Sequence, residues 1–261
     1  MVKVPDYVAG HDLLKGKSVL LTAAAGGGIG FAAAQRCAEE GCRAVVISDI
    51  HERRLNEAVE KLQQTHPETA ITGRLANVAS EEDVQNLVDA AEEFTGGVDV
   101  LINNAGLGGS KNVVDMSDDE WLRVIDVSLT GTFRMTRAML KKMQPRGAGA
   151  IVNNASVLGW RAQKEQAHYA AAKAGVMALT RCSALEAADF GIRINAVAPS
   201  IALHEFLKKT ASEELLASLE SREAFGRAAE VWEIANVMVF LASDYASYLV
   251  GEVISASSQR A

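Results

Sequence analysis

Short aliphatic runs alternate with longer helix-prone stretches along almost the whole chain of 261 residues. Apolar runs without polar alternation are typical of strands buried on both faces, as in a parallel sheet covered by helices. Strands are predicted at 18–22, 44–48, 70–76, 98–103, 150–154, 192–198 and 252–255. Helices are predicted near 29–41, 52–65, 80–95, 118–143, 166–190 and 231–242. The alternation therefore predicts an α/β fold.

No repeat, low-complexity block or linker divides the chain, so residues 1–261 are expected to form a single domain. Residues 1–15 are predicted to be an irregular N-terminal arm. The stretch 200–229 breaks the alternation because it is polar, helix-prone and follows a strand directly. We interpret it either as a substrate flap over the strand ends or as an ordinary connecting helix.

Composition excludes several classes of partner. A formal net charge of -7 leaves no basic stripe for nucleic acid. The three cysteines have no metal-ligand spacing, and they predict reduced thiols, no metal site and a cytoplasmic protein. No apolar run is long enough to span a bilayer, so no membrane partner is expected.

Tyr169 and Lys173 lie four positions apart in YAAAKAGVMALT, and Ser156 stands upstream at the end of an apolar run. On a helix, residues i and i+4 share a face. The Lys ammonium is then expected to favour the phenolate and to lower the pKa of Tyr169 toward the working pH. Such a group can exchange a proton with an alcohol. The alternative is a half-buried tyrosine beside a solvated lysine.

A glycine-rich turn follows the first predicted strand, in TAAAGGGIGFAAAQ. Gly26, Gly28 and Gly30 are the expected close-approach positions for a pyrophosphate at a helix N-terminus. Asp49 ends the second strand, where a carboxylate binds ribose hydroxyls and repels a 2′-phosphate. The cofactor is therefore predicted to be NAD rather than NADP. The neighbouring Arg53 and Arg54 keep NADP open, although they are expected to be solvated.

Taken in order, four features resemble the short-chain dehydrogenase/reductase (SDR) family from about Lys15 to about Ser255. They are Gly28-Ile29-Gly30, the run Asn103-Asn104-Ala105-Gly106, Ser156, and Tyr169-x-x-x-Lys173. The resemblance implies a single-domain Rossmann fold with a doubly wound parallel seven-stranded sheet and helices on both faces. It also implies hydride transfer between a nicotinamide and a carbonyl or alcohol carbon.

The resemblance implies a role for each matching residue. Tyr169 would be the general acid/base, Lys173 its partner and a ligand of the nicotinamide ribose, and Ser156 a hydrogen-bond donor to the substrate oxygen. Ser128 stands where the family has a catalytic-relay Asn, whose backbone carbonyl holds a water. The implied cofactor-binding residues are Ala24, Gly28, Ile29, Gly30, Asp49, Asn77, Val78, Asn104, Ala105, Gly106, Tyr169, Lys173, Pro199 and Ile201.

The chain also departs from the family pattern. Its glycine loop is one residue longer, and alanines replace the first glycine. Asn77 replaces an Asp that accepts a hydrogen bond from adenine, Ser200 replaces a Gly, and His204 falls where a Thr often contacts the carboxamide. We expect weakened or unchanged catalysis from Ser128, because a backbone carbonyl does not require an Asn side chain.

Substrate recognition is expected in 156–169 and in 200–229, from Trp160, Arg161 and the glutamines Gln163 and Gln166, together with Phe206, Lys208 and Lys209 on the proposed flap. These residues are compatible with a bulky apolar substrate that carries an anionic handle.

NNASVLGWRAQ, HYAAAKAGVMALTRCSALEA and SASSQRA resemble actinobacterial SDRs that act on steroid-derived rings as coenzyme A thioesters. This predicts an NAD(H)-dependent oxidoreductase that interconverts a ring secondary alcohol and a ketone on an acyl-CoA. The alternatives are an NADPH-dependent 3-oxoacyl-[acyl-carrier-protein] reductase and a non-catalytic nucleotide-binding scaffold. By resemblance, the chain is expected to form a homodimer or homotetramer through the helices near 118–143 and 166–190.

Overall fold

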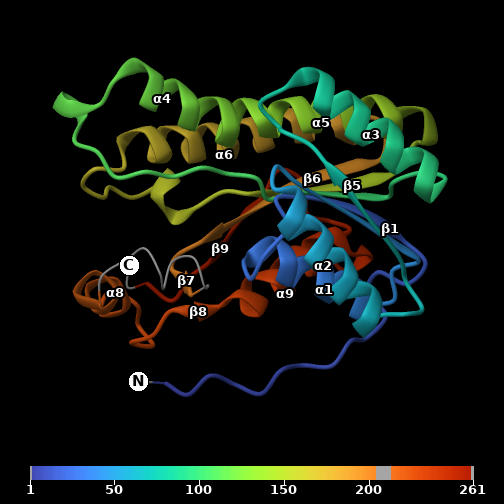
Figure 1. Ribbon diagram of the computed structural model, residues 1–261, viewed down its shortest axis with the longest axis horizontal. Helices are drawn as coiled ribbons and strands as arrows, with labels where there is room; N and C mark the ends of the chain where they lie inside the picture. Colours follow the sequence, from blue (N-terminus) through green and yellow to red (C-terminus); the bar gives the residue numbers. More distant parts are fainter. Residues whose placement is uncertain (1, 204–212, 260–261) are drawn as a thin grey trace.

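The computed structural model describes residues 2–203 and 213–259, and a sheet of seven parallel strands lies at its centre (Figure 1). The strand order is β3-β2-β1-β4-β5-β6-β9. The strands are β1 (Ser18–Thr22), β2 (Ala44–Asp49), β3 (Ala70–Leu75), β4 (Val100–Asn103), β5 (Gly149–Asn154), β6 (Ile192–Pro199) and β9 (Val253–Ala256). The predicted α/β fold is confirmed. The order reverses between β1 and β4, and ligands bind at such switch points in open parallel sheets.

Helices cover both faces of the sheet (Figure 1). One layer consists of α3 (Glu81–Thr95), α4 (Asp118–Ile125), α5 (Gly131–Met143) and α6 (Ala167–Ala188). The other consists of α1 (Ile29–Glu39), α2 (Glu52–Thr65) and α9 (Val231–Ala242). Within the described residues, no helix is long and apolar enough to cross a membrane.

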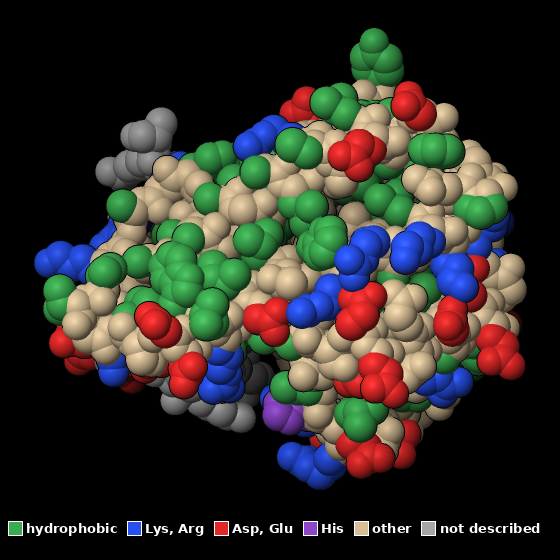
Figure 2. Space-filling model, turned by 90° about the horizontal axis from the view of Figure 1, so that it is seen from above, with side chains coloured by type: hydrophobic (Ala, Val, Ile, Leu, Met, Phe, Trp, Pro, Cys, Tyr) green, Lys and Arg blue, Asp and Glu red, His purple; other side chains and the backbone are tan. Residues whose placement is uncertain are grey.

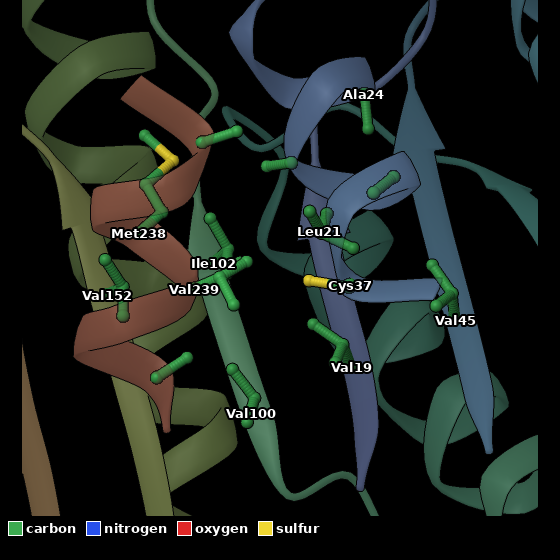
Figure 3. Packing of buried hydrophobic residues seen from close by; sticks show 14 of the residues in the cluster. Val19, Leu21, Ala24, Cys37, Val45, Val100, Ile102, Val152, Met238 and Val239 are labelled. Carbon is green, nitrogen blue, oxygen red and sulfur yellow. The ribbon is translucent and has the colours of Figure 1, made fainter. Parts of the chain in front are cut away.

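The strands are apolar throughout because both of their faces are buried. In β1, Val19 and Leu21 join the core beneath α1 and α9, whereas Leu20 joins the core beneath α3 and α5. Figure 3 shows Met238 and Val239 of α9 lying over β4 and β5. Burying each such side chain stabilises the fold by about 1.5–3 kcal/mol.

A seam of buried amides joins the two strands next to the switch point. Asn103 Nδ2 on β4 donates to Asn153 Oδ1 on β5 at 2.9 Å and to Thr136 Oγ1 on α5 at 3.1 Å. Asn153 Nδ2 donates in turn to Thr180 Oγ1 on α6 at 2.9 Å. Because each buried amide without a partner would cost about 1–3 kcal/mol, the seam holds the strands and the upper helices together.

The prediction of a single α-helix near 118–143 is wrong in one respect. A π-helical turn, Asp126–Thr130, separates α4 from α5. Its central residue, Ser128, is fully buried and bonds through Oγ to both backbone groups of Leu107, accepting from N at 2.9 Å and donating to O at 3.0 Å. π-Turns of this kind insert one residue into a helix and are frequent at functional sites.

The N-terminal segment before β1 contacts helices α1 and α9. The Arg36 guanidinium on α1 donates to the carbonyls of Val8 and Ala9 and pairs with the buried Glu40 at 2.5 Å. The ring of Tyr7 also packs edge-on against Trp232 of α9. The arm therefore spans the outer side of α1 and α9.

The described parts of the segment 200–229, which are 200–203 and 213–229, lie beside the main sheet (Figure 1). Its strand β7 (Ala202–Leu203) pairs with β8 (Ala229–Glu230), and helix α8 (Glu213–Glu220) lies between them in the sequence. The predicted contacts from His204, Phe206, Lys208 and Lys209 lie outside the described residues.

Candidate active site

Two cavities open at the carboxyl ends of the strands, one on each side of the switch point. The first, of about 350 Å³, is lined on the β2 and β3 side and is called here the adenosine-side cavity. The second, of about 260 Å³, lies beyond β5 and β6 and is called the reaction cavity. The adenosine-side cavity contains the predicted residues Asp49, Asn77, Val78, Ala105 and Gly106. The reaction cavity contains Ile29, Ser156, Tyr169, Pro199 and Ile201.

Lys173 lies beneath the reaction cavity with only 2% of its surface exposed. Its Nζ donates to the backbone oxygen of Asn154 at 2.6 Å and lies 5.6 Å from the centre of the Tyr169 ring. Burial lowers the pKa of Lys173 to about 8. The residue is therefore held in place by the end of β5 and is not a solvated lysine.

Tyr169 stands one turn before Lys173 on α6 and faces the same cavity as Ser156. Burial raises the pKa of Tyr169, and a hydrogen bond with Ser156 opposes that rise. The expected depression of this pKa by Lys173 is thus not found in the chain alone, because desolvation of the phenolate is the larger effect.

Gly106 lines the adenosine-side cavity and lies next to Lys173. A Cβ on Gly106 would lie 3.3 Å from Lys173 Nζ and 3.8 Å from Ser128 Oγ. Ser128 in turn holds Leu107, so the π-turn fixes the segment that separates Lys173 from the adenosine-side cavity. The side chain at position 128 thus bonds to backbone, which the sequence alone did not indicate.

The backbone is strained at the beginning of the longer glycine loop. Ala23 stands in the left-handed region with φ 51°, and Gly26 follows with φ 92°. A Cβ on Gly30 would lie 2.5 Å from both the Ala23 carbonyl oxygen and Asn104 Nδ2. A Cβ on Gly28 would meet nothing within 4 Å. Gly30 is thus required by the protein itself, whereas the space above Gly28 is free for a ligand.

Asn104 braces the loop against the sheet. Its Nδ2 donates to the Ala23 carbonyl at 2.9 Å, and its Oδ1 accepts from Asn154 Nδ2 at 2.9 Å. Ala24, predicted to bind the cofactor, is fully buried in the core, and its N–H bonds to the Ser48 carbonyl at 3.0 Å. Ala24 therefore lines neither cavity.

The acid at the end of β2 is mostly buried. Asp49 accepts from the N–H groups of Ala25 and His51 at 3.3 and 3.0 Å. Burial raises the pKa of Asp49, while the N–H groups of Ala25 and Ile50 and the nearby Arg54 oppose the rise. Arg53 is exposed and pairs with Glu57, as expected of a solvated residue. Arg54 also lines a neighbouring cavity of about 290 Å³.

Asn77 is exposed at the rim of the adenosine-side cavity. Its Oδ1 already accepts from the N–H of Ala79 at 3.0 Å. An amide oxygen has a second lone pair, so Asn77 Oδ1 can still accept the hydrogen bond from adenine that was expected from the sequence.

Some residues of the reaction cavity were not predicted from the sequence, among them Asn154, Ala155 and Gln259 of the C-terminal tail. Leu219, on α8, belongs to the segment 200–229 that was expected to recognise substrate, but it was not singled out. Gln259 lies far along the chain from Tyr169, and no local pattern marks it. Gln163, which was predicted, lines the same cavity.

The residues fit a nicotinamide dinucleotide. Such a ligand has two nucleoside halves joined by a pyrophosphate, and the structure offers a cavity for each half. The glycine loop leads into α1 between β1 and β2, where backbone N–H groups at a helix N-terminus favour phosphate.

Comparison with known proteins agrees with this geometry. The family model described as enoyl-(acyl carrier protein) reductase matches residues 23–258. A crystal structure of a short-chain dehydrogenase from Mycobacterium smegmatis is 54% identical, has a TM-score of 0.88, and is matched over 99% of each chain. The chain belongs to the short-chain dehydrogenase/reductase family. It is therefore an oxidoreductase that uses a nicotinamide cofactor, as predicted, and the scaffold alternative is not supported.

Two curated relatives narrow the comparison. The (5R,7aS)-5-hydroxy-7a-methyl-1-oxo-2,3,5,6,7,7a-hexahydro-1H-indene-carboxyl-CoA reductase of Mycobacterium tuberculosis is 60% identical over 261 residues, covering 98% of this chain and 97% of the relative. The 3-oxoacyl-[acyl-carrier-protein] reductase of Vibrio cholerae is 35% identical over 241 residues, covering 92% and 96%. This SDR is thus similar to reductases of acyl thioesters.

Proposed function

We propose that this SDR interconverts a secondary alcohol and a ketone on a steroid-derived ring that is carried as a coenzyme A thioester, with NAD as the cofactor. The observation that carries the proposal is that Ser156 and Tyr169 line one cavity, while the buried amine of Lys173 lies 5.6 Å from the centre of the Tyr169 ring. Ile29, Pro199 and Ile201 line the same cavity. The hydroxyl groups of Ser156 and Tyr169, next to the buried amine of Lys173, can transfer a proton to or from a substrate oxygen.

Each residue has a distinct task in this mechanism. When bound, the nicotinamide supplies or accepts the hydride at the carbinol carbon. Tyr169 gives the proton to the substrate oxygen in reduction and takes it back in oxidation. Ser156 holds that oxygen by a hydrogen bond, which matters most when negative charge develops on it. Lys173, anchored to the Asn154 carbonyl, holds the ribose and stabilises the phenolate.

The preference for NAD follows from Asp49. Its carboxylate lines the adenosine-side cavity and is positioned by two backbone N–H groups. A fixed carboxylate accepts hydrogen bonds from ribose hydroxyls and repels a 2′-phosphate. Arg54 nearby opposes this preference, but Asp49 lies closer to the strand end where the ribose is bound in this fold.

The substrate class follows from the 60% identical relative, whose name specifies a hydroxylated methyl-oxo-hexahydroindene carboxyl-CoA. The reaction cavity is compatible with such a ring, because Ala155, Val157, Leu158 and Leu219 supply apolar walls. Leu219 belongs to α8, and this supports the interpretation of 200–229 as a substrate flap.

One assay tests the proposal. Hydroxy- and keto-hydrindane CoA thioesters and the matching free acids are offered with NAD(H) and NADP(H), and the absorbance of the reduced cofactor is recorded. We expect turnover with the thioesters and NAD(H). Equal or better turnover of the free acids would refute the proposal that the substrate is a CoA thioester. Tighter binding of NADPH than of NADH would refute the proposal that the cofactor is NAD.

A second function is favoured by the similarity to the Vibrio cholerae enzyme and by the description of the matching family model. A 3-oxoacyl-[acyl-carrier-protein] reductase would reduce short acyl-carrier-protein thioesters with NADPH. Asp49 opposes this function, and the same assay with acetoacetyl thioesters separates the two.

We also propose that two or four copies associate through the face formed by α4 and α5. Figure 2 shows apolar side chains gathered on the half of this face where α4 lies. The exposed apolar residues include Trp121, Leu122 and Phe133, which are 38%, 57% and 40% exposed. A second copy is the occupant expected by the family resemblance. Light scattering of Trp121→Glu, which places a charge on this face, should report a smaller particle than the parent protein, and an unchanged mass would refute this interface.

A further inference from the structure

The C-terminal tail after β9 is pinned beside the reaction cavity. The backbone N–H and Oγ of Ser258 donate to Glu223 Oε2 at 3.1 and 2.8 Å, and the Ala224 N–H donates to the Ser258 carbonyl. Glu223 is only 3% exposed, and it forms an antiparallel bridge with Gln259. One oxygen of this buried carboxylate is bonded to the tail at Ser258, and this bond together with the bridge fixes the position of the next residue, Gln259.

The neighbour of Gln259 determines how its amide is oriented. The Arg161 guanidinium donates to Gln259 Oε1. Arginine has only donors, so the atom that faces it must be the amide oxygen. The amide NH₂, with its two donors, is the part of the side chain left for other partners. Because Gln259 lines the same cavity as Ser156 and Tyr169, these donors lie at the wall of the reaction site.

The wall around Gln259 contains both apolar and polar side chains. Val157, Leu158 and Leu219 line the cavity with it, and so do Gln163 and Ser200. A donor beside apolar side chains favours a ligand with an acceptor at that point and penalises one without it, because the bound ligand would then keep water away from an unpaired donor.

From this geometry we infer that Gln259 is a specificity-determining residue, which donates a hydrogen bond to a second carbonyl oxygen of the substrate, away from the alcohol that reacts. The inference rests on the proposed function. Two carbonyls of the proposed substrate class qualify, the ring ketone and the thioester carbonyl. Arg161 acts through Gln259 as a positioning residue, because it holds the amide oxygen and thereby aims the NH₂.

The test compares substrates that differ by one carbonyl. Four hydrindane alcohols serve as probes, with and without the ring ketone, each as the CoA thioester and as the CoA thioether that lacks the thioester carbonyl. The variants are Gln259→Leu, which removes both donors at similar size, and Gln259→Glu, which keeps an acceptor toward Arg161 but offers no NH₂. Gln64→Leu, at an exposed position on α2, is the matched control.

The parent should prefer the carbonyl-bearing probe, and both Gln259 variants should reduce that preference in kcat/KM by about tenfold, as expected for one hydrogen bond. Loss of the ketone preference assigns the bond to the ring ketone, and loss of the thioester preference assigns it to the thioester. Gln64→Leu should leave both ratios unchanged. Turnover by the parent with both ratios unaltered in the folded Gln259 variants would overturn the inference alone. No turnover of any probe by the parent would refute the proposed function, and the inference with it.

Discussion

The amine of Lys173 lies 5.6 Å from the centre of the Tyr169 ring, and Lys173 is buried while Tyr169 is half-buried at the wall of the reaction cavity. Burial acts on them in opposite directions, since it raises the pKa of the phenol and lowers that of the ammonium to about 8. Both shifts favour the neutral forms, but at neutral pH only the shift of Lys173 costs stability, because the phenol is neutral in the unfolded chain as well.

Replacing Lys173 with Met should stabilise the ligand-free fold while removing activity. The depressed pKa corresponds to a penalty on the order of 3 kcal/mol at pH 7, from which loss of the bond to the Asn154 carbonyl subtracts about 1 kcal/mol. Above pH 8 the folded parent releases this proton and the unfolded chain keeps it, so the parent becomes more stable as the pH rises toward 10. The gap between variant and parent should therefore narrow over this range.

Chemical denaturation of both proteins at pH 7, 8, 9 and 10 measures that gap. A gap that stays constant with pH would contradict a depressed pKa at this residue.

Ser156→Ala should shift the pH dependence of alcohol oxidation to higher pH. The hydrogen bond from Ser156 lowers the pKa of Tyr169, so its loss leaves burial unopposed and raises that pKa further. The rising limb of kcat/KM with pH reports this group. Tyr169→Phe is the control, and it should reduce kcat by about 10²–10⁴-fold while cofactor binding persists. If kcat/KM of Ser156→Ala rises over the same pH range as that of the parent, a group other than Tyr169 is responsible for the rise.

Gly28→Ala and Gly30→Ala form a matched pair within one loop. A methyl on Gly30 would press on the Ala23 carbonyl and Asn104, so this variant should lose about 1–3 kcal/mol of stability. A methyl on Gly28 meets open space, so the variant should fold normally but bind the cofactor more weakly. Thermal unfolding and titration of NADH fluorescence measure the two effects. Full cofactor affinity in Gly28→Ala would place the pyrophosphate elsewhere.

Asp49→Asn should narrow the preference for NAD over NADP by about tenfold or more. The amide keeps the size and one of the two acceptors, since Ala25 and His51 donate to different oxygens of Asp49, but it removes the charge that repels a 2′-phosphate. Steady-state kinetics with the two cofactors give the ratio for variant and parent. An identical ratio would mean that Arg54, and not Asp49, decides the preference.

Local patterns determined most of the fold and part of the site. The strands were predictable because burial on both faces leaves continuous apolar runs, and Lys173 could be placed near Tyr169 because four helical residues make one turn. Ser128 was identified as a departure, but its bonds to Leu107 join segments that are distant in the sequence.

Long-range contacts account for what the sequence did not indicate. The tail reaches the reaction cavity through Ser258 and the buried Glu223, and no periodicity marks that contact. The direction of the Tyr169 pKa depended on how deeply α6 is covered, which charge spacing alone does not reveal.

The amide seam between β4 and β5 has one more consequence. If either strand slid along its neighbour by a single residue, Asn103 and Asn153 would turn toward the opposite helix layer and lose their partners. Folding intermediates with a shifted register would then contain several buried amides without hydrogen-bond partners, which makes them less stable. The same two strands lead directly to Asn104 and Asn154, so correct alignment of the sheet and correct assembly of the catalytic machinery are a single event.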